Sequence, residues 1–317
     1  MNRLGWWGLC VAMLALLGAC SGGGQGAGGP GGDGGAGGND GATGGDAGAA
    51  ACTSYTPMTI AAMRTPATPG CYELANVALV ARTSSATTPR LYVQDPQGGD
   101  YSAVMAKCSA TAVHPCPASA LATALQVLDG ESVTLRGYYE HGKVSGFEEF
   151  SIESITDNGA TLTIPPPVTL AEADLGRNAR VPTKWFQKAK VNVTKLVMYD
   201  FSPAEMQLTG PCPAWEGFAM ISASAGATAA TACNATTNPT GVSTPAAGEI
   251  LVGRQFFHNF TYSTDCACAA AHHQILLTSA NFVSGTATGI LILETPKGST
   301  TAYQVFEPLS KTDFPVQ

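Results

Sequence analysis

The sequence is poor in charge. Asp, Glu, Lys and Arg make up only 12% of its 317 residues, where about a quarter is usual. Acidic residues outnumber basic ones by 23 to 16, which gives a formal net charge of −7. Broad electrostatic binding to nucleic acid or anionic lipid is therefore not expected, because both need an excess of Lys and Arg. A fully disordered chain is not expected either, since 45% of the residues are hydrophobic.

Motifs that carry catalytic chemistry are also missing. There is no Gly-x-Ser-x-Gly turn and no Gly-x-x-x-x-Gly-Lys-Ser/Thr phosphate loop. The adjacent Glu148 and Glu149 would point to opposite faces of a strand, so they cannot form a close acid–base pair. We therefore predict that the protein is not an enzyme and has no catalytic residue and no cofactor.

The N-terminal apolar run is too short for an ordinary membrane-spanning helix. It covers the 14 residues Leu4–Leu17, whereas about 20 are needed. Arg3 precedes it, and Leu-Gly-Ala-Cys at residues 17–20 ends it. This ending resembles the lipobox of bacterial lipoproteins, which implies cleavage before Cys20, a lipid on its thiol and acylation of the new N-terminus. The alternative is an ordinary secretory signal with a chance cysteine.

Localisation and domain organisation follow from this resemblance and from a glycine-rich segment. Ser21, and not Asp, follows the cysteine, which by the family's usual sorting rule implies the outer membrane, on its periplasmic or outer side. Between Ser21 and Ala50, 16 of 30 residues are glycine, so no core can form there. The predicted parts are a signal peptide at 1–19, a lipidated cysteine and disordered tether at 20–51, and folded domains at 52–175 and 176–317.

Eight cysteines remain outside the signal and the lipid site. An even number in an exported chain indicates disulfides. Proximity suggests the pairs Cys52–Cys71 and Cys108–Cys116. The remaining four can pair across in either order: Cys212 and Cys233 with Cys266 and Cys268.

A metal site is the competing interpretation of the last two cysteines. Cys266 and Cys268 precede His272 and His273, so two thiols and two imidazoles lie within eight residues. Thiolate and imidazole ligands would suit zinc or copper. Exported thiols tend to oxidise, which favours the disulfides.

Short strands fill the folded part. Apolar and β-branched runs bounded by Gly, Pro and Asp predict three strands, a helix and two strands. The predicted strands are residues 77–82, 90–95, 101–107, 132–140 and 147–155, with the helix at 119–128. A second copy is predicted with strands at 190–197, 204–208, 217–222, 255–262 and 274–282, a loop in the helix position at 225–248, and an added hairpin at 289–294 and 301–306.

This element order is that of a five-stranded Greek-key OB barrel. The segments Leu91–Ser102 and Asp129–Gly137 resemble the OB-like domains found beside secreted bacterial nucleases, and Thr59–Arg64 resembles their opening segment. The match of residues 127–130 to 250–253 places both segments just before a fourth strand. We therefore predict an all-β protein with minor helix and two tandem OB-like barrels. The resemblance implies an accessory or binding domain, because catalysis in that family belongs to a separate domain. An immunoglobulin-like sandwich is the rival fold.

Aromatic residues are the candidates for a ligand face. Such barrels bind oligonucleotides or oligosaccharides on the second and third strands and the adjoining loops, where Tyr92, Tyr101 and His141 fall. Tyr139, on the predicted fourth strand, is a further candidate. The alternative is that strand aromatics belong to the core. Asp95 and Asp100 flank a turn and could share a calcium ion, although turn formation is the favoured explanation.

The predicted function is that of a non-catalytic binding or scaffolding lipoprotein. The lipid bilayer would be contacted through Cys20, and the partner would be an envelope protein or glycan. The alternatives are a nucleic-acid-binding accessory protein and a metal-binding protein or enzyme that uses Cys266, Cys268, His272 and His273.

Overall fold

A computed structural model describes most of the first folded half and separate segments of the second. The described residues are 51–141, 148–176, 179–193, 195–197, 219–222, 248–252, 256, 262–263, 275–276, 285–294 and 303–313. Residues 1–50, which hold the predicted signal peptide and nearly all of the predicted tether, lie outside them, as do the last four cysteines, His272 and His273. In the described part, no helix is long and apolar enough to cross a membrane.

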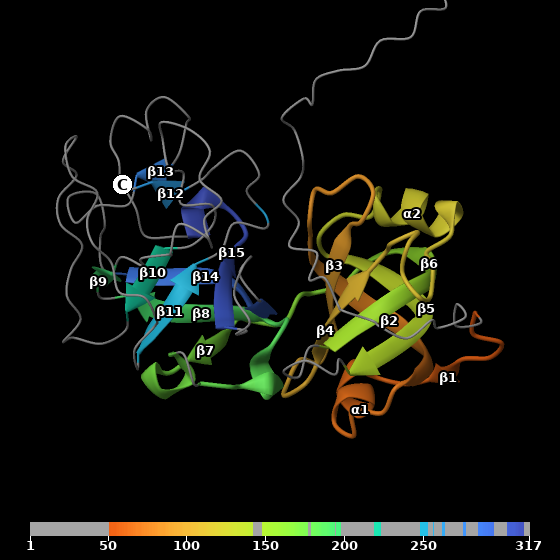
Figure 1. The fold of residues 1–317 in the computed structure, drawn as a ribbon, viewed down its shortest axis with the longest axis horizontal. Helices are drawn as coiled ribbons and strands as arrows, with labels where there is room; N and C mark the ends of the chain where they lie inside the picture. The colour runs from red at the N-terminus through yellow and green to blue at the C-terminus, as the bar shows by residue number, and fades with distance from the viewer. Residues whose placement is uncertain are drawn as a thin grey trace, which may run out of the picture. The chain divides into compact units, whose positions relative to one another are not determined.

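The first half contains the predicted order of three strands, a helix and two strands (Figure 1). Strands β2 and β6 are longer than predicted, and two short elements before β2 were not predicted as a strand and a helix. Strand identity along most of this half was thus predictable from apolar runs and turn residues. The elements are β1 (Thr56–Pro57), α1 (Ile60–Arg64), β2 (Gly70–Arg82), β3 (Arg90–Gln94), β4 (Ala103–Lys107), α2 (Ala118–Ala124), β5 (Glu131–His141) and β6 (Glu148–Thr161).

The five long strands of this half close on themselves. Antiparallel ladders join β2 to β3, β3 to β4, β5 to β6 and β2 to β5. The pair β4–β6 is parallel. Alternation along the strands sends one set of side chains inward. That set includes Leu79, Leu91, Val104, Val133 and Phe150, all at most 1% exposed.

The second half is also strand-rich, and one sheet carries most of it. Its order is β7-β8-β14-β15-β11-β10-β9, and β11–β15 and β7–β8 are its parallel pairs. The strands β12 (Tyr262–Ser263) and β13 (Ile275–Leu276) pair only with each other. The strands of the main sheet are β7 (Val168–Leu170), β8 (Lys188–Val193), β9 (Lys195–Val197), β10 (Ala219–Ser222), β11 (Glu249–Val252), β14 (Gly285–Glu294) and β15 (Tyr303–Pro308).

Two predictions for the second half need correction. The segment placed before a fourth strand, 250–253, overlaps β11, which is itself a strand inside the sheet. The hairpin predicted as an addition, β14 and β15, lies in the middle of the sheet, between β8 and β11. Most of the predicted strands at 255–262 and 274–282 lies outside the described residues, and β12 and β13 overlap their described ends. Apolar runs indicate that a segment is a strand, but its position in the sheet depends on the strands with which it pairs.

Two glycines mark matching close approaches in the two sheets. Gly137 on β5 faces Ile152, and two residues further Tyr139 faces Phe150. Gly289 on β14 faces Pro308, and two residues further Leu291 faces Phe306. A Cβ on either glycine would collide with the backbone oxygen that follows the phenylalanine and press on its ring. Only glycine therefore fits at both positions.

The outward side chains of β2–β4 share a core with the second half. Val80, Tyr92 and Met105 are at most 3% exposed and belong to the same apolar cluster as Phe186 and Ile290. Tyr92 packs against Phe186 and Phe256, with ring centroids 6.4 and 5.3 Å apart. The β2–β4 surface is thus interior to the molecule.

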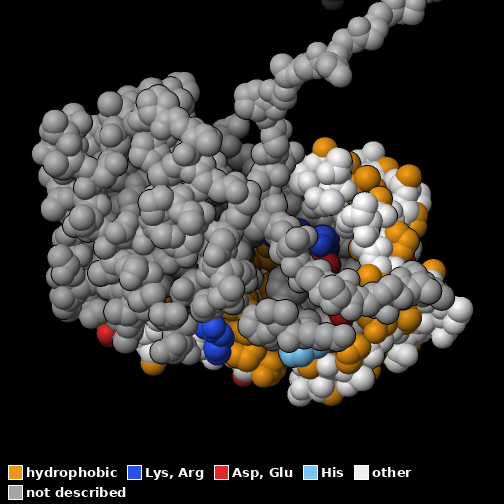
Figure 2. Space-filling view, viewed as in Figure 1, with side chains coloured by type: hydrophobic (Ala, Val, Ile, Leu, Met, Phe, Trp, Pro, Cys, Tyr) orange, Lys and Arg blue, Asp and Glu red, His pale blue; other side chains and the backbone are white. Residues whose placement is uncertain are grey.

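The described surface carries few charged side chains. On the face shown in Figure 2, few Lys, Arg, Asp or Glu side chains appear among the coloured residues. The exposed large hydrophobic residues of the described part are Val113 and Leu128. This agrees with the low charge content of the sequence.

Candidate functional site

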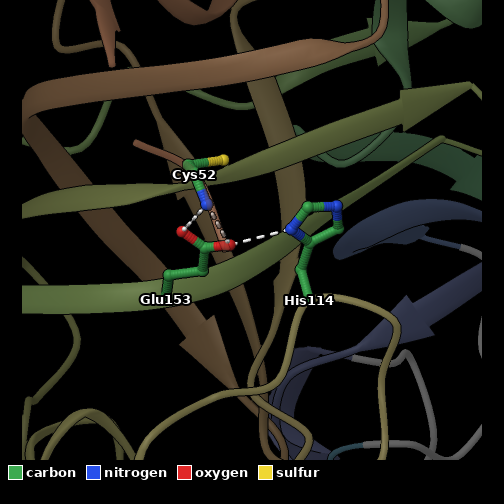
Figure 3. Close-up of side chains that lie close together, drawn as sticks. All are labelled: Cys52, His114 and Glu153. Atoms are coloured by element: carbon green, nitrogen blue, oxygen red, sulfur yellow. Dashed lines mark hydrogen bonds and ion pairs between the residues drawn. The ribbon is translucent and has the colours of Figure 1, made fainter. Parts of the chain in front are cut away.

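One buried polar cluster surrounds Glu153 on β6 (Figure 3). Its carboxylate accepts hydrogen bonds from the backbone N–H of Cys52, at 3.2 Å to each oxygen, and from the Tyr55 hydroxyl at 2.7 Å. His114 Nδ1 lies 2.8 Å from Oε1, and its ring stacks on Tyr138 at 4.1 Å. We call these five residues the Glu153 cluster.

Two disulfides position this cluster. Cys52 is bonded to Cys71 on β2, and the loop that carries His114 is closed by Cys108–Cys116. Both pairings were predicted from proximity in the sequence, and both are confirmed. The cluster was not predicted, because it joins residues about 40 and 100 positions apart. The only local signal was a histidine between two closely spaced cysteines.

Hydrogen bonding sets the protonation state of the cluster. Burial by itself would raise the pKa of Glu153, but the bonds from Tyr55, His114 and Cys52 outweigh it and lower the pKa below its ordinary value. Burial and the adjacent carboxylate raise the pKa of Tyr55 to about 12. The carboxylate is therefore held ionised, and the tyrosine is held protonated.

The cluster also contains metal-ligating atom types. Cys52 Sγ, a His114 ring nitrogen and a Glu153 oxygen all lie within 4.8 Å of one another. In the structure, however, Cys52 Sγ is bonded to Cys71 Sγ at 2.00 Å. A disulfide sulfur is a poor metal ligand, because binding needs the thiolate. In this oxidised form the cluster therefore offers only an imidazole and a carboxylate.

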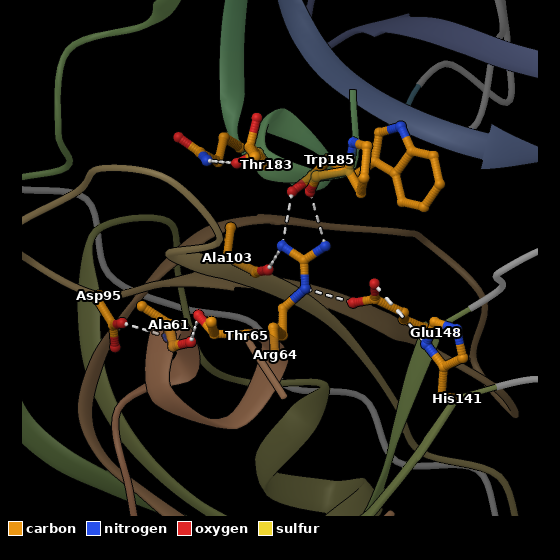
Figure 4. Close-up of polar contacts among 11 residues, drawn as sticks. Ala61, Arg64, Thr65, Asp95, Ala103, His141, Glu148, Thr183 and Trp185 are labelled. Atoms are coloured by element: carbon orange, nitrogen blue, oxygen red, sulfur yellow. Dashed lines mark hydrogen bonds and ion pairs between the residues drawn. The ribbon is translucent and has the colours of Figure 1, made fainter. Parts of the chain in front are cut away.

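A second buried cluster surrounds Arg64, the last residue of α1 (Figure 4). Its Nε donates to Glu148, and its other nitrogens donate to the backbone oxygens of Ala103 at 2.8 Å and Pro182 at 2.9 Å. The guanidinium also lies 5.3 Å from the ring centres of Tyr101 and Phe186. We call this the Arg64 cluster.

The Arg64 cluster joins the two halves. Arg64, Glu148 and Ala103 belong to the first half, whereas Pro182 precedes β8 of the second. The backbone N–H of Tyr101 donates to the Thr183 oxygen at 2.8 Å and adds another bond across the junction. Arg64 is 1% exposed, so its N–H groups bond protein atoms and not solvent. This arrangement serves to hold the halves together and leaves the guanidinium unavailable to an anionic ligand.

The paired glutamates behave as the strand geometry predicts. Glu148 contacts Arg64, whereas Glu149 lies 3.5 Å from Lys107. Burial raises the pKa of Glu149, and Lys107 opposes this. The two carboxylates thus have separate partners and do not form an acid–base pair.

The predicted ligand-face residues do not assemble into one exposed surface. Tyr92 and Tyr139 are both 0% exposed, so neither ring is presented to a ligand. Tyr101 is half-buried beneath Arg64, and His141 is exposed, with Nδ1 4.0 Å from Glu148. The prediction failed for Tyr92 because the second half covers β2–β4, and for Tyr139 because it points inward.

Asp95 serves the first half as a structural residue. Its two carboxylate oxygens accept the N–H groups of Ile60 and Ala61 at 3.1 Å each, at the start of α1. Burial raises the pKa of Asp95, and these two bonds oppose the rise. Asp100 is exposed in the turn before Tyr101. The arrangement therefore matches the turn and capping interpretation better than a shared calcium ion.

Comparisons with known proteins give little similarity. No family model matches the chain, and no curated protein matches it. Among solved structures, OBody AM1L10 bound to hen egg-white lysozyme is 14% identical over 35% of this chain and 97% of its own, with a TM-score of 0.28. Asparaginyl-tRNA synthetase from Pyrococcus horikoshii, complexed with asparaginyl-adenylate, is 13% identical over 34% of this chain and 24% of its own, with a TM-score of 0.27. Similarities of this size carry no argument about function.

Proposed function

We propose that the chain is a lipid-anchored, non-catalytic scaffold of the bacterial envelope, in which two tandem OB-like barrels act as one body and bind a glycan. The observation that carries this proposal is the junction: an apolar core and the Arg64 cluster join the halves. Two halves that are joined in this way can present a fixed binding surface. They are less suited to closing around a substrate.

Matching strand orders support the two OB-like Greek-key barrels. The first half closes in the order β2-β3-β4-β6-β5, with the third and fifth strands parallel. The second half has the corresponding order β9-β10-β11-β15-β14-β8, with β11 and β15 parallel, and only Thr194 separates β8 from β9. The equivalent positions of Gly137 and Gly289 support this alignment of strands.

The outer face of β5 and its neighbours is the surface we assign to the glycan. Alternation places Thr134, Arg136 and Tyr138 on one face of β5. Asn158 Nδ2 donates there to Thr134 and Asn76, each at 3.2 Å. Neutral amides and hydroxyls beside aromatic rings can bond sugar hydroxyls and stack on sugar rings.

A glycan is favoured over a protein partner because large exposed hydrophobic residues are few. Protein interfaces have an apolar centre rich in aromatic residues. Val113 and Leu128 are the large hydrophobic side chains that the described part leaves exposed, at 58% and 61%.

Co-sedimentation of the full chain with purified peptidoglycan sacculi tests the glycan surface. We expect binding that Asn158→Ala weakens at least fivefold, because that side chain organises the polar face. Thr169→Ala, an exposed threonine on β7, is the matched control and should bind as the wild type does. Equal binding by the two variants, or no binding by the wild type, would contradict the assignment.

The lipid anchor is tested separately. Cells that express the chain are labelled with radioactive palmitate and fractionated, and we expect label and membrane association in the wild type only. Cys20→Ala should abolish both, whereas Cys10→Ala should keep both. Label that persists in Cys20→Ala would reject the lipoprotein proposal without affecting the glycan proposal.

The nucleic-acid alternative has less support from the structure. Tyr92, which would stack on a base, is fully buried, and the net charge is −7. We expect no change in the fluorescence anisotropy of labelled single-stranded DNA when the full chain is added at low salt. Binding that weakens steeply as salt is added would reinstate this alternative.

A further inference from the structure

We propose that the Glu153 cluster is a redox-gated zinc site, closed by the Cys52–Cys71 disulfide and opened by its reduction. The site would take a borderline-soft divalent ion on two thiolates, one imidazole and one carboxylate. The proposal does not depend on the lipid anchor or on glycan binding.

The ligand geometry carries the first step. The Cys52, His114 and Glu153 ligand atoms already lie within 4.8 Å of one another. Reduction adds Cys71 Sγ, which starts in bonding contact with Cys52 Sγ. Ligands around a tetrahedral zinc ion, at about 2.0 to 2.3 Å from it, lie roughly 3 to 4 Å apart. The Cys52, His114 and Glu153 ligand atoms therefore need shifts of only about 1 Å, and the released Cys71 thiol must turn toward them to complete the site.

The surroundings of the ligands carry the second step. His114 and Glu153 are each 7% exposed at the side chain. Tyr138 stacks on the imidazole, while the Tyr55 hydroxyl and the Cys52 N–H donate hydrogen bonds to the carboxylate. Metal ligands need outer partners of this kind to fix their orientation. The cluster therefore holds an imidazole and a carboxylate in fixed orientations before any metal binds.

The disulfide is accessible to a reductant. Cys52 and Cys71 are both half-buried, whereas Cys108 and Cys116 are buried. Exposed disulfides are the more readily exchanged ones. Cys52 also lies near the beginning of the described residues, before β1. Its release therefore breaks no strand pairing of the first half. A reductant can thus open this bond and leave the second disulfide closed.

The chemistry balances as follows. A small dithiol gives two electrons and two protons to the Cys52–Cys71 bond and leaves as its own cyclic disulfide. Zn²⁺ then binds, and the two thiol protons pass to solvent. The His114 Nδ1 atom, which faces Glu153, releases to solvent the proton that it donated to that carboxylate, while Nε2 carries the proton of the neutral ring. The Nδ1 lone pair then binds the ion, which replaces the hydrogen bond to Glu153.

Thiol protection in the full chain tests the site directly. The reduced chain is treated with iodoacetamide, with and without Zn²⁺, and alkylation of each cysteine is followed by peptide mapping. We expect Zn²⁺ to slow alkylation of Cys52 and Cys71 at least tenfold in the wild type. Mapping by peptide separates this site from any zinc held by the other cysteines.

Two ligand variants with matched controls complete the test. His114→Ala and Glu153→Gln should lose the protection of Cys52, whereas His141→Ala and Glu140→Gln, on exposed residues of β5, should keep it. Co²⁺ should give the reduced wild type a thiolate charge-transfer absorption that both ligand variants reduce. Should His114→Ala fail to fold, as circular dichroism would show, Glu153→Gln decides. Protection that persists in Glu153→Gln, or its absence in the wild type, would overturn the proposal.

Discussion

At the scale of the residue, Arg64 and Arg136 each pair with a glutamate in very different surroundings. The Arg64 and Glu148 side chains are 0% and 3% exposed, whereas those of Arg136 and Glu73 are 51% and 22% exposed. Removal of one partner of a buried pair leaves an uncompensated charge. Exposed pairs contribute little, because water screens them. Identical substitutions at the two arginines should therefore differ greatly in effect.

Arg64→Ala should lower the free energy of unfolding by about 3–5 kcal/mol. Arg136→Ala should lower it by less than about 1 kcal/mol. Urea unfolding followed by tryptophan fluorescence measures both. Similar values for the two variants would show that the Arg64 cluster does not hold the halves together.

Glu153 gives a prediction about pH. Its pKa in the fold lies below its ordinary value of 4.5, so its ionised form stabilises the fold above that value. This contribution is lost as the pH falls through the lowered pKa. Glu153→Gln should be less stable than the wild type at neutral pH, and the gap should close under acid conditions. Thermal unfolding of both chains between pH 7 and pH 3 measures this.

Glu149 provides the contrast for that measurement. Burial raises its pKa, so the ionised form of Glu149 is disfavoured in the fold. Its ionisation therefore destabilises the fold, whereas the ionisation of Glu153 stabilises it. Glu149→Gln should therefore not reproduce the pH-dependent gap of Glu153→Gln. A gap that stays constant with pH in Glu153→Gln would mean that packing, not charge, explains its loss of stability.

At the scale of the element, Gly137 is a position of β5 that has no room for a side chain. A Cβ there would collide with the Ser151 backbone oxygen and press on the Phe150 ring. Gly137→Ala should therefore lower the free energy of unfolding by about 3 kcal/mol or more. Gly159→Asn is the control, because that site has a φ of +66° and open space around it, and asparagine tolerates such a backbone. Chemical denaturation of both variants distinguishes a steric clash from a general intolerance of substitution.

Local sequence patterns predicted where strands occur better than they predicted which strands and residues come into contact. The apolar runs and turn residues of the first half gave β3 and β5 to within a residue at each end. In the second half β11 carries the same kind of run but was not recognised as a strand, because only its parallel partner β15 defines its place. The Glu153 and Arg64 clusters were missed for the same reason: their members are distant in sequence. The proximity of cysteines was the one local clue that located part of a site.

At the scale of the whole molecule, the covered face of β2–β4 makes the first half dependent on the second. Tyr92 and Met105 would become exposed if the chain ended near residue 166. A large exposed apolar patch promotes aggregation. A fragment truncated there should form aggregates that size-exclusion chromatography with light scattering detects.

Met105→Lys should improve the behaviour of the fragment but destabilise the full chain. In the fragment it should raise the monomeric fraction, because it places a charge on the exposed face. In the full chain it should lower the free energy of unfolding by at least about 2 kcal/mol, because it buries an unpaired charge. A soluble, monomeric fragment without the substitution would show that the first half is complete by itself.

The Cys52–Cys71 bond also decides how the fold responds to pulling. Any tension that arrives along the residues before Cys52 meets a covalent link to β2 at the first described cysteine. The force then passes straight into a strand held by ladders on both sides. The short ladder of β1 and the helix α1 lie inside the 19-residue loop that this bond closes, so they carry no load. A pull from the N-terminal side is therefore resisted by the paired strands of the first half as a unit, strand against strand.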